Sequence, residues 1–331
     1  MSSPCKRRRH HLCCRLPDVT LLSYIASRVL QMIPVVIGVS LIAFFAIHLV
    51  PGDPVQLMMH GRATPETLQA AHAKLGLDQP LLIQYWHFIT NAATGTLGTS
   101  IVQNADVGKI VGERLLPTVL LLVTSAVFAI LIALPLSIIA ARRSDQVADH
   151  AIRLIGIIGF AMPPFWVGII LMLFFGIYLE WFPISGYGRS FGDRMYHLVL
   201  PSLTIALFLA PILIQSLRAA ILDVMTAEYI TVARAKGLGP WRILIKHALR
   251  NALMPVTTIL AVNIGWLLSG AVVVEYLFSF PGLGSLLVRA VGQRDYPVIQ
   301  GLSLVFAILV LVVNLLADLS YMLIDRRVLK T

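Results

Sequence analysis

Six long apolar runs constrain the fold of this chain more than any other feature of its sequence. They cover residues 25–50, 117–141, 154–179, 198–221, 253–278 and 298–324. Each run can cross a bilayer, because about 20 helical residues at about 1.5 Å per residue span a hydrocarbon core of about 30 Å. Of all residues, 58% are hydrophobic and only 13% are charged, and the mean hydropathy is +0.84. The sequence therefore predicts an all-α polytopic membrane protein with six transmembrane helices.

The basic residues predict how these helices are oriented. Most of the 26 Lys and Arg residues precede the first span, follow the second or fourth span, or end the chain. Cytoplasmic loops of membrane proteins carry such an excess, so both termini are predicted to be cytoplasmic. The formal charge of +10 then reflects topology and attraction to anionic membrane lipid. Nucleic-acid binding is disfavoured, because the basic residues flank spans and form no separate domain.

Residues 1–23 are predicted to form a basic, disordered cytoplasmic leader, and residues 325–331 a short cytoplasmic tail. The leader contains Cys5 and, after it, four potential soft-metal ligands: His10, His11, Cys13 and Cys14. Adjacent pairs in a flexible segment are poorly suited to tetrahedral coordination, so no metal site is predicted. Because all three cysteines lie in this leader, no structural disulfide is expected either.

The largest loop, residues 51–116, follows the first span on the extracytoplasmic side. Two helices are predicted in it, over 64–76 and over 80–93, with Asp78 as the N-cap of the second. The aromatic residues available to rest on the membrane interface are Tyr85, Trp86 and Phe88. This helical region either caps the helix bundle or offers a docking surface to an external protein, and the sequence favours neither reading.

Two adjacent prolines, Pro163 and Pro164, stand near the middle of the third span. Proline removes a backbone donor and clashes with the preceding turn, so a kink or a break is expected there. The carbonyl groups freed by such a break often line a transport pathway, although a passive kink is equally compatible with the sequence.

Polar residues inside the spans are few, namely Asn263, Ser269, Glu275, Asn314 and Asp318. A carboxylate at the membrane centre costs about 2.5–3.5 kcal/mol on insertion scales. We therefore expect Glu275 near the outer end of the fifth span and Asp318 toward the inner end of the sixth, both in structural roles. Asn263 is a possible pathway residue together with the two prolines. The spans contain no series of acidic residues of the kind that would suggest a proton or sodium relay.

Two common sequence signatures of enzymes are absent from this chain. No G-x-x-x-x-G-K-[ST] run is present, so the chain does not hold a nucleotide by the P-loop route. The H-E-x-x-H signature of zinc proteases is also missing. We predict no catalytic site and no cofactor in this chain.

The charged segment 222–252 separates the fourth and fifth spans. Its spacing predicts an amphipathic helix over 223–236, which Gly237 ends in the left-handed conformation. Gly239 and Pro240 then start a second apolar stripe. The apolar contacts of the first helix are assigned to Val224, Ala227, Ile230, Val232 and Ala233. On physical grounds alone, this hairpin could be a pair of interfacial membrane helices.

A series of residues in this segment carries a family resemblance: Tyr229, Ile230, Ala233, Arg234, Ala235, Lys236, Gly237, Leu238, His247, Leu249, Arg250, Asn251, Ala252 and Pro255. Further motifs are Pro51-Gly52-Asp53-Pro54, Leu75-Gly76-Leu77-Asp78-Gln79-Pro80-Leu81, Leu97-Gly98-Thr99-Ser100, Phe280-Pro281-Gly282-Leu283-Gly284 and Arg294-Asp295-Tyr296-Pro297-Val298-Ile299-Gln300. Together they resemble the EAA loop and flanking motifs of binding-protein-dependent ABC importer permeases, in the dipeptide, oligopeptide and nickel branch. Thr231, Val232 and Arg250 depart from the general loop motif, as that branch tolerates.

The resemblance implies a type I ABC importer permease in a bacterial inner membrane. It also implies three kinds of protein partner: a second homologous permease, two cytoplasmic ATPase subunits that bind ATP and Mg, and an external substrate-binding protein. Membrane lipid is a further partner, which the positive charge predicts. The residues implied in coupling to the ATPase are Tyr229, Ala233, Arg234, Ala235, Lys236, Gly237, His247, Arg250 and Asn251. The implied substrate is a di- or oligopeptide, with a nickel chelate or glutathione as alternatives. A stand-alone secondary transporter is the rival from another class; internal repeats or coupling-ion residues would support it, and neither is convincing in the sequence.

Overall fold

The computed structural model describes residues 21–48, 78–100, 102–249, 256, 259 and 262–324. Its elements in chain order are α1 (Leu21–His48), α4 (Leu81–Ala93), α5 (Val107–Arg142), α6 (Val147–Ala161), α7 (Pro164–Leu171), η1 (Met172–Tyr178), α8 (Phe191–Met225), α9 (Glu228–Ala235), α10 (Pro240–Ile243), η2 (Leu244–Leu249), α13 (Ile264–Leu277), α14 (Leu283–Gln293) and α15 (Tyr296–Ile324). These residues contain no β-strand, so the predicted all-α class is confirmed. Residues 1–20 of the leader and the helix predicted over 64–76 fall outside them.

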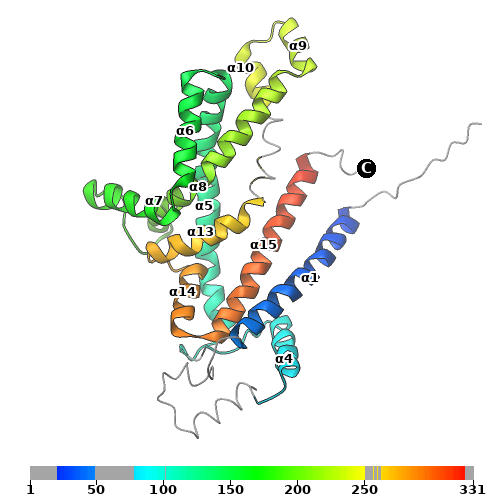
Figure 1. Ribbon diagram of the computed structural model, residues 1–331, viewed down its shortest axis with the longest axis vertical. Helices are drawn as coiled ribbons and strands as arrows, with labels where there is room; N and C mark the ends of the chain where they lie inside the picture. The colour runs from blue at the N-terminus through cyan, green and yellow to red at the C-terminus, as the bar shows by residue number, and fades with distance from the viewer. Residues whose placement is uncertain are drawn as a thin grey trace, which may run out of the picture.

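Four of these helices, α1, α5, α8 and α15, are long and apolar enough to cross a membrane. The pair formed by α6 with α7 and η1 would be a fifth span. Much of the run predicted over 253–278 falls outside the described residues, which contain its later part as the shorter helix α13. The described residues thus account for four or five of the six predicted spans. The helices α9 and α10 lie at one end of the molecule, and α4 and α14 lie at the other (Figure 1).

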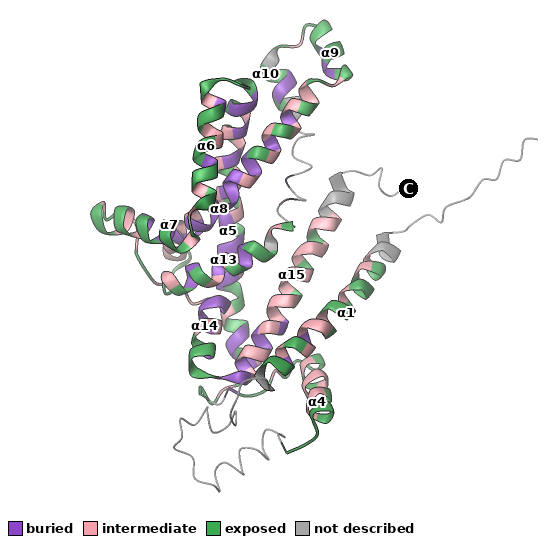
Figure 2. Ribbon diagram, viewed as in Figure 1, coloured by how far each residue is buried: buried purple, intermediate pink, exposed green. Residues whose placement is uncertain are grey.

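Helices α5 and α8 pack against each other at the centre of the molecule (Figures 1 and 2). In the apolar window of α8, 67% of the residues are buried, against 11% in α1 and in α15. Small residues such as Ala129 and Ala133 of α5 are fully buried, which allows the close approach of the two backbones. The hydroxyl groups of Thr124 and Ser202 lie 2.6 Å apart and join the two helices by a hydrogen bond.

Helices α1 and α15 pair along the edge of this core. Arg28 Nε lies 3.2 Å from Asp318 Oδ2, so the acidic group that the sequence places in the last span has a cationic partner. This ion pair removes the main cost of placing a carboxylate near hydrocarbon, because the charge is compensated by a neighbouring helix.

The third predicted span, 154–179, is broken by a bend of 103° between α6 and the helix formed by α7 and η1. A residue that precedes proline is disfavoured in the α-helical region of φ and ψ, and two consecutive prolines impose this restriction on two successive residues. Met162 and Pro163 are accordingly extended, with ψ angles of 132° and 136°. The expected break at Pro163 and Pro164 is therefore confirmed, and it is sharp enough to turn α7 away from α6 (Figure 1).

Helix α4 lies against the C-terminal half of α1. Tyr85 Oη is 2.9 Å from Ser40 Oγ, and the rings of Tyr85 and Phe88 pack against Phe44. Of the three aromatic residues expected at the membrane interface, Trp86 is the one that is largely exposed, at 66%. The predicted N-cap at Asp78 is wrong, because the N-cap position is occupied by Pro80 and no side chain caps the helix.

Glu275 is the centre of a buried network at the end of α13. Its Oε1 accepts a hydrogen bond from Thr118 Oγ1 of α5 at 2.7 Å, and its Oε2 accepts from the backbone N–H groups of Gly284 and Ser285 at 2.7 and 3.1 Å. Thr118 Oγ1 also accepts from the N–H of Leu283 at 2.8 Å. These contacts satisfy the first N–H groups of α14, which a helix leaves without an internal partner. The structural role expected for Glu275 fits this arrangement.

Replacing Gly284 by Ala is expected to destabilise the protein by about 1–3 kcal/mol, the usual cost of overpacking. A Cβ at this position would lie 2.4 Å from Val272 Cα, a backbone atom that cannot move aside. A lower midpoint of thermal unfolding in detergent would show the effect. The matched control is Gly292→Ala on the same helix, where a Cβ meets nothing within 4 Å and a gain of about 0.5–1 kcal/mol is expected. Equal midpoints for the two variants would contradict this account.

Candidate functional site

The candidate site is the hairpin made by α9, the turn at Gly237, α10 and η2, which we call the 228–249 hairpin. Its turn follows directly from the sequence Ala-Lys-Gly-Leu. The N–H of Gly237 donates to the carbonyl of Arg234 at 2.9 Å, and the N–H of Leu238 donates to the carbonyl of Ala233 at 3.3 Å. This pair of bonds is the Schellman motif, which needs a left-handed residue just after the helix. Gly237 supplies it with φ +75°, as predicted.

The first arm of the hairpin starts later than the sequence predicts. Instead of one helix over 223–236, α8 continues to Met225 and α9 begins at Glu228. Thr226 causes this break, because its hydroxyl donates to the carbonyl of Asp223 at 2.8 Å and its own N–H bonds to the same carbonyl. Ala227 is then extended, with ψ 145°, and the chain changes direction before α9.

A small apolar core holds the two arms of the hairpin together. Ile230 and Ala233 of α9 are buried against Ile243 of α10, and Leu238 packs on the same cluster. Contrary to prediction, Val232 takes no part and is 54% exposed, because α9 presents Ile230 and Ala233 on one face and Val232 lies off it. The hairpin is thus a packed unit and not two independent surface helices.

Two contacts attach the second arm of the hairpin to the helix bundle. Leu244 is buried with Ala141 of α5 and Ile221 of α8. Beside this cluster, Arg142 Cζ lies 4.4 Å from the centre of the Trp241 ring, within the range of a cation–π interaction. The hairpin therefore contacts the ends of both central helices. A displacement of the hairpin would consequently shift the ends of α5 and α8 together.

A buried ion pair lies just behind these contacts, at the turn between α5 and α6. Arg218 of α8 donates from Nε and Nη2 to the two carboxylate oxygens of Asp149 at 2.7 and 2.6 Å. Asp149 is fully buried, and the side chain of Arg218 is 16% exposed. Asp149 also accepts the N–H of Asp145, a residue held at φ +61°. The pair fixes the α5–α6 turn to α8 with bidentate geometry.

Most of the residues that the resemblance implicates in coupling lie on the open side of the hairpin. Tyr229, Arg234, Ala235, Lys236 and Gly237 are exposed, whereas Ala233 is buried in the hairpin core. A Cβ built on Gly237 would meet nothing within 4 Å, so the space beside the turn is open. His247 belongs to η2, and Arg250 and Asn251 fall outside the described residues.

The possible pathway residues do not form one cluster. Pro163 and Pro164 lie at the break before α7, which approaches the far end of α13, where a Cβ on Gly168 would lie 2.7 Å from Leu277 Cδ2. Asn263 stands at the other end of α13, about 20 Å away along a helix of 14 residues. Its side-chain amide donates to the carbonyl of Ile259 at 2.8 Å.

One short sequence match to a hydrolase signature, G-x-S-x-G at residues 188–192, has a local structural role. Ser190 is the N-cap of α8 and accepts the N–H of Asp193 at 3.2 Å. The carboxylate of Asp193 in turn accepts the N–H of Arg189 at 2.8 Å. The signature requires a serine on a strand-to-helix turn, and no strand precedes this one in the described residues. We assign it to helix capping. Nor do the described residues bring together three His, Cys, Asp or Glu side chains that could hold a metal ion.

Comparison with known proteins supports these observations. Residues 133–330 match the family described as "Binding-protein-dependent transport system inner membrane component", and residues 21–123 match the N-terminal family of such membrane components. The chain is 38% identical to the glutathione transport system permease protein GsiC of Escherichia coli (strain K12) over 305 residues. It is 37% identical to the protein of the same name in Salmonella typhi over 305 residues. Each alignment covers 92% of this chain and 98% of the relative.

A solved structure shares the fold. The inward-facing MetNI methionine ABC transporter matches with a TM-score of 0.54 at 18% sequence identity, covering 65% of this chain and 96% of the matched chain. At this identity the match shows the fold alone, and it is the type I permease fold implied by the sequence.

Proposed function

The chain belongs to the binding-protein-dependent transport system inner membrane component family and is the permease subunit of an ABC importer. On this basis, we propose that the 228–249 hairpin is the element through which ATPase subunits change the conformation of the permease. The observation that supports this most is the combination of an exposed turn at Gly237 with a buried hairpin core. An exposed polar surface offers a partner somewhere to bind, and the packed core lets the hairpin move as one body.

The contacts of the hairpin suggest how movement would reach the membrane. Trp241 and Leu244 contact the end of α5, and the chain runs directly from α8 into α9 through Thr226 and Ala227. A partner shifts a conformational equilibrium only through contacts that differ between the two states. We propose that ATP and Mg, bound by the ATPase subunits, change the position of the hairpin and thereby tilt α5 and α8.

The proposed assembly contains this chain, a second homologous permease, two ATPase subunits and an extracytoplasmic binding protein. The hairpin faces the cytoplasm, and both termini lie on the same side. The ion pair between Arg28 and Asp318 joins the inner parts of α1 and α15 in this orientation. The opposite end, with α4 and α14, is then the side that receives the binding protein.

For the substrate we propose a short peptide, and glutathione, a tripeptide, is the first to test because the relatives aligned over 92% of this chain are named as glutathione permeases. Di- and oligopeptides are the alternatives. In this proposal the external binding protein selects the substrate, and the permease contributes the path.

The test is purification of the chain from its own membrane, followed by identification of its partners and uptake measurements with labelled glutathione and a labelled dipeptide. We expect a P-loop ATPase and a second permease to co-purify, and uptake to require ATP. A homo-oligomer without an ATPase would overturn the coupling proposal. Uptake of the dipeptide without glutathione would overturn only the proposed substrate.

A further inference from the structure

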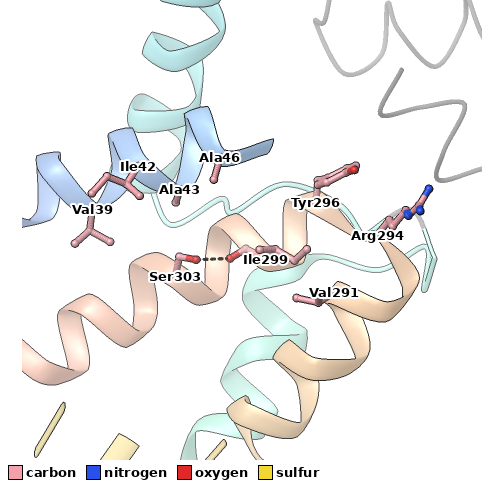
Figure 3. A pocket seen from close by; sticks show the side chains of 9 residues that line it. All are labelled: Val39, Ile42, Ala43, Ala46, Val291, Arg294, Tyr296, Ile299 and Ser303. Carbon is pink, nitrogen blue, oxygen red and sulfur yellow. Dashed lines mark hydrogen bonds between the residues drawn. The ribbon is translucent and has the colours of Figure 1, made fainter. Parts of the chain in front are cut away.

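A pocket with a volume of about 470 Å³ lies between α1 and the junction of α14 with α15 (Figure 3). This junction is at the end of the molecule opposite to the 228–249 hairpin (Figure 1). Helix α1 contributes Val39, Ile42, Ala43 and Ala46 to one wall. Val291 and Ile299 contribute to the facing wall. Since these are small or aliphatic side chains, and all but Val291 lie on the candidate membrane spans α1 and α15, the walls suit a hydrocarbon ligand.

The pocket is polar at one end only. Arg294 and Tyr296 lie where α14 gives way to α15, at the outer end of the span, and Val39 lies toward the other end (Figure 3). Ser303 is the other polar residue of the lining, and its hydroxyl donates a hydrogen bond to the carbonyl of Ile299 at 2.9 Å. Among the residues that line the pocket, all within the described ranges, Arg294 alone is charged.

The turn that presents Arg294 is built and held in place. Arg294 has φ +56°, a left-handed conformation that costs a residue with a side chain free energy. The next residue, Asp295, is buried, accepts a hydrogen bond from Ser100 Oγ and donates its N–H to the carbonyl of Ala290 at 2.9 Å. Strained residues held by such contacts cluster at functional sites.

The depth of the pocket matches one bilayer leaflet. From Val39 to Ala46, α1 rises by about 10 Å, within the roughly 15 Å of one leaflet. A phospholipid has the same order of groups along the membrane normal, with a phosphate at the interface and acyl chains below it. A peptide fits this pocket poorly, because its backbone N–H and C=O groups would face aliphatic walls without hydrogen-bond partners.

We propose that this pocket binds an acyl chain of an anionic glycerophospholipid, whose phosphate pairs with Arg294. The lipid fills the outer part of the groove between α1 and α15 and links the turn at Arg294 to α1. Guanidinium groups suit phosphate because they donate several hydrogen bonds in a fixed plane.

The test uses the chain with its partner subunits in nanodiscs that contain equal amounts of phosphatidylglycerol and phosphatidylethanolamine. After partial removal of lipid with detergent, mass spectrometry identifies the lipid that stays bound. We expect phosphatidylglycerol to be retained preferentially. Arg294→Gln should lower this retention about tenfold, as expected for the loss of a hydrogen bond to a charged group. Arg294→Lys should restore much of it.

Two further variants separate lipid binding from general effects. Arg289→Gln removes the same charge from an exposed residue of α14 that does not line the pocket, and it should leave retention unchanged. Ala43→Phe fills the apolar part of the pocket and should reduce retention although Arg294 is intact. The proposal is overturned if neither lipid is preferred, if Arg294→Gln and Arg289→Gln behave alike, or if Ala43→Phe retains the lipid.

Discussion

Replacing Gly237 by Trp is expected to abolish import while the chain still inserts into the membrane. The left-handed conformation costs a residue with a side chain about 1–2 kcal/mol, and here φ is +75°. The indole would also occupy the open space beside the turn, where we propose that the ATPase docks. Uptake of labelled substrate should fall to background, with the amount of chain in the membrane unchanged on an immunoblot and the ATPase lost on purification.

The control for this variant is Gly237→Asn. Asparagine tolerates the left-handed conformation better than other residues and adds a much smaller side chain than Trp. We expect Gly237→Asn to keep most of the uptake and to retain the ATPase. Full uptake by a well-inserted Gly237→Trp variant would refute docking at this turn. Equal loss in both variants would place the requirement in the backbone of the hairpin and would also contradict docking through free space.

The features that the sequence predicted correctly are those that short stretches of chain determine. The break at Pro163 and Pro164 follows from proline stereochemistry alone. The end of α9 at Gly237 follows from a glycine with an apolar residue after it, because Leu238 closes the Schellman motif onto the hairpin core. The long apolar runs similarly predicted α1 and α15, since hydrophobic length decides whether a helix can span a membrane.

Contacts between distant segments were missed, because no local pattern reports them. Asp149 and Arg218 are separated by 69 positions, and neither was singled out. A weak signal was present, since Asp149 lies on a helix with an apolar face and close to Arg142, Arg143 and Arg153, but the exposed Asp145 in the same segment carries the same signal. The contact of Arg142 with Trp241 joins the end of α5 to α10, two elements far apart in the sequence. Local capping explains the smaller errors: Thr226 delays the start of α9, and Pro80 displaces Asp78 as a cap.

Replacing Asp149 by Ala is expected to destabilise the protein by about 3–5 kcal/mol, which is typical when one partner of a buried ion pair is removed. Arg218 would keep its charge with only 16% of its side chain exposed, and Arg153, whose Nε lies 3.5 Å from the same carboxylate, would lose a counter-charge too. The α5–α6 turn would also lose the acceptor for the N–H of Asp145. A large drop in the midpoint of thermal unfolding of the detergent-solubilised chain would show this effect.

The double variant Asp149→Leu with Arg218→Met identifies the origin of that loss. Buried ion pairs often contribute little net stability, because the desolvation of both charges offsets their attraction, whereas a single unpaired charge is costly. We therefore expect the double variant to unfold well above Asp149→Ala and close to the unchanged protein. If it is as unstable as Asp149→Ala, then the bidentate hydrogen bonds themselves stabilise the junction of α6 with α8, and the argument from an uncompensated charge is wrong.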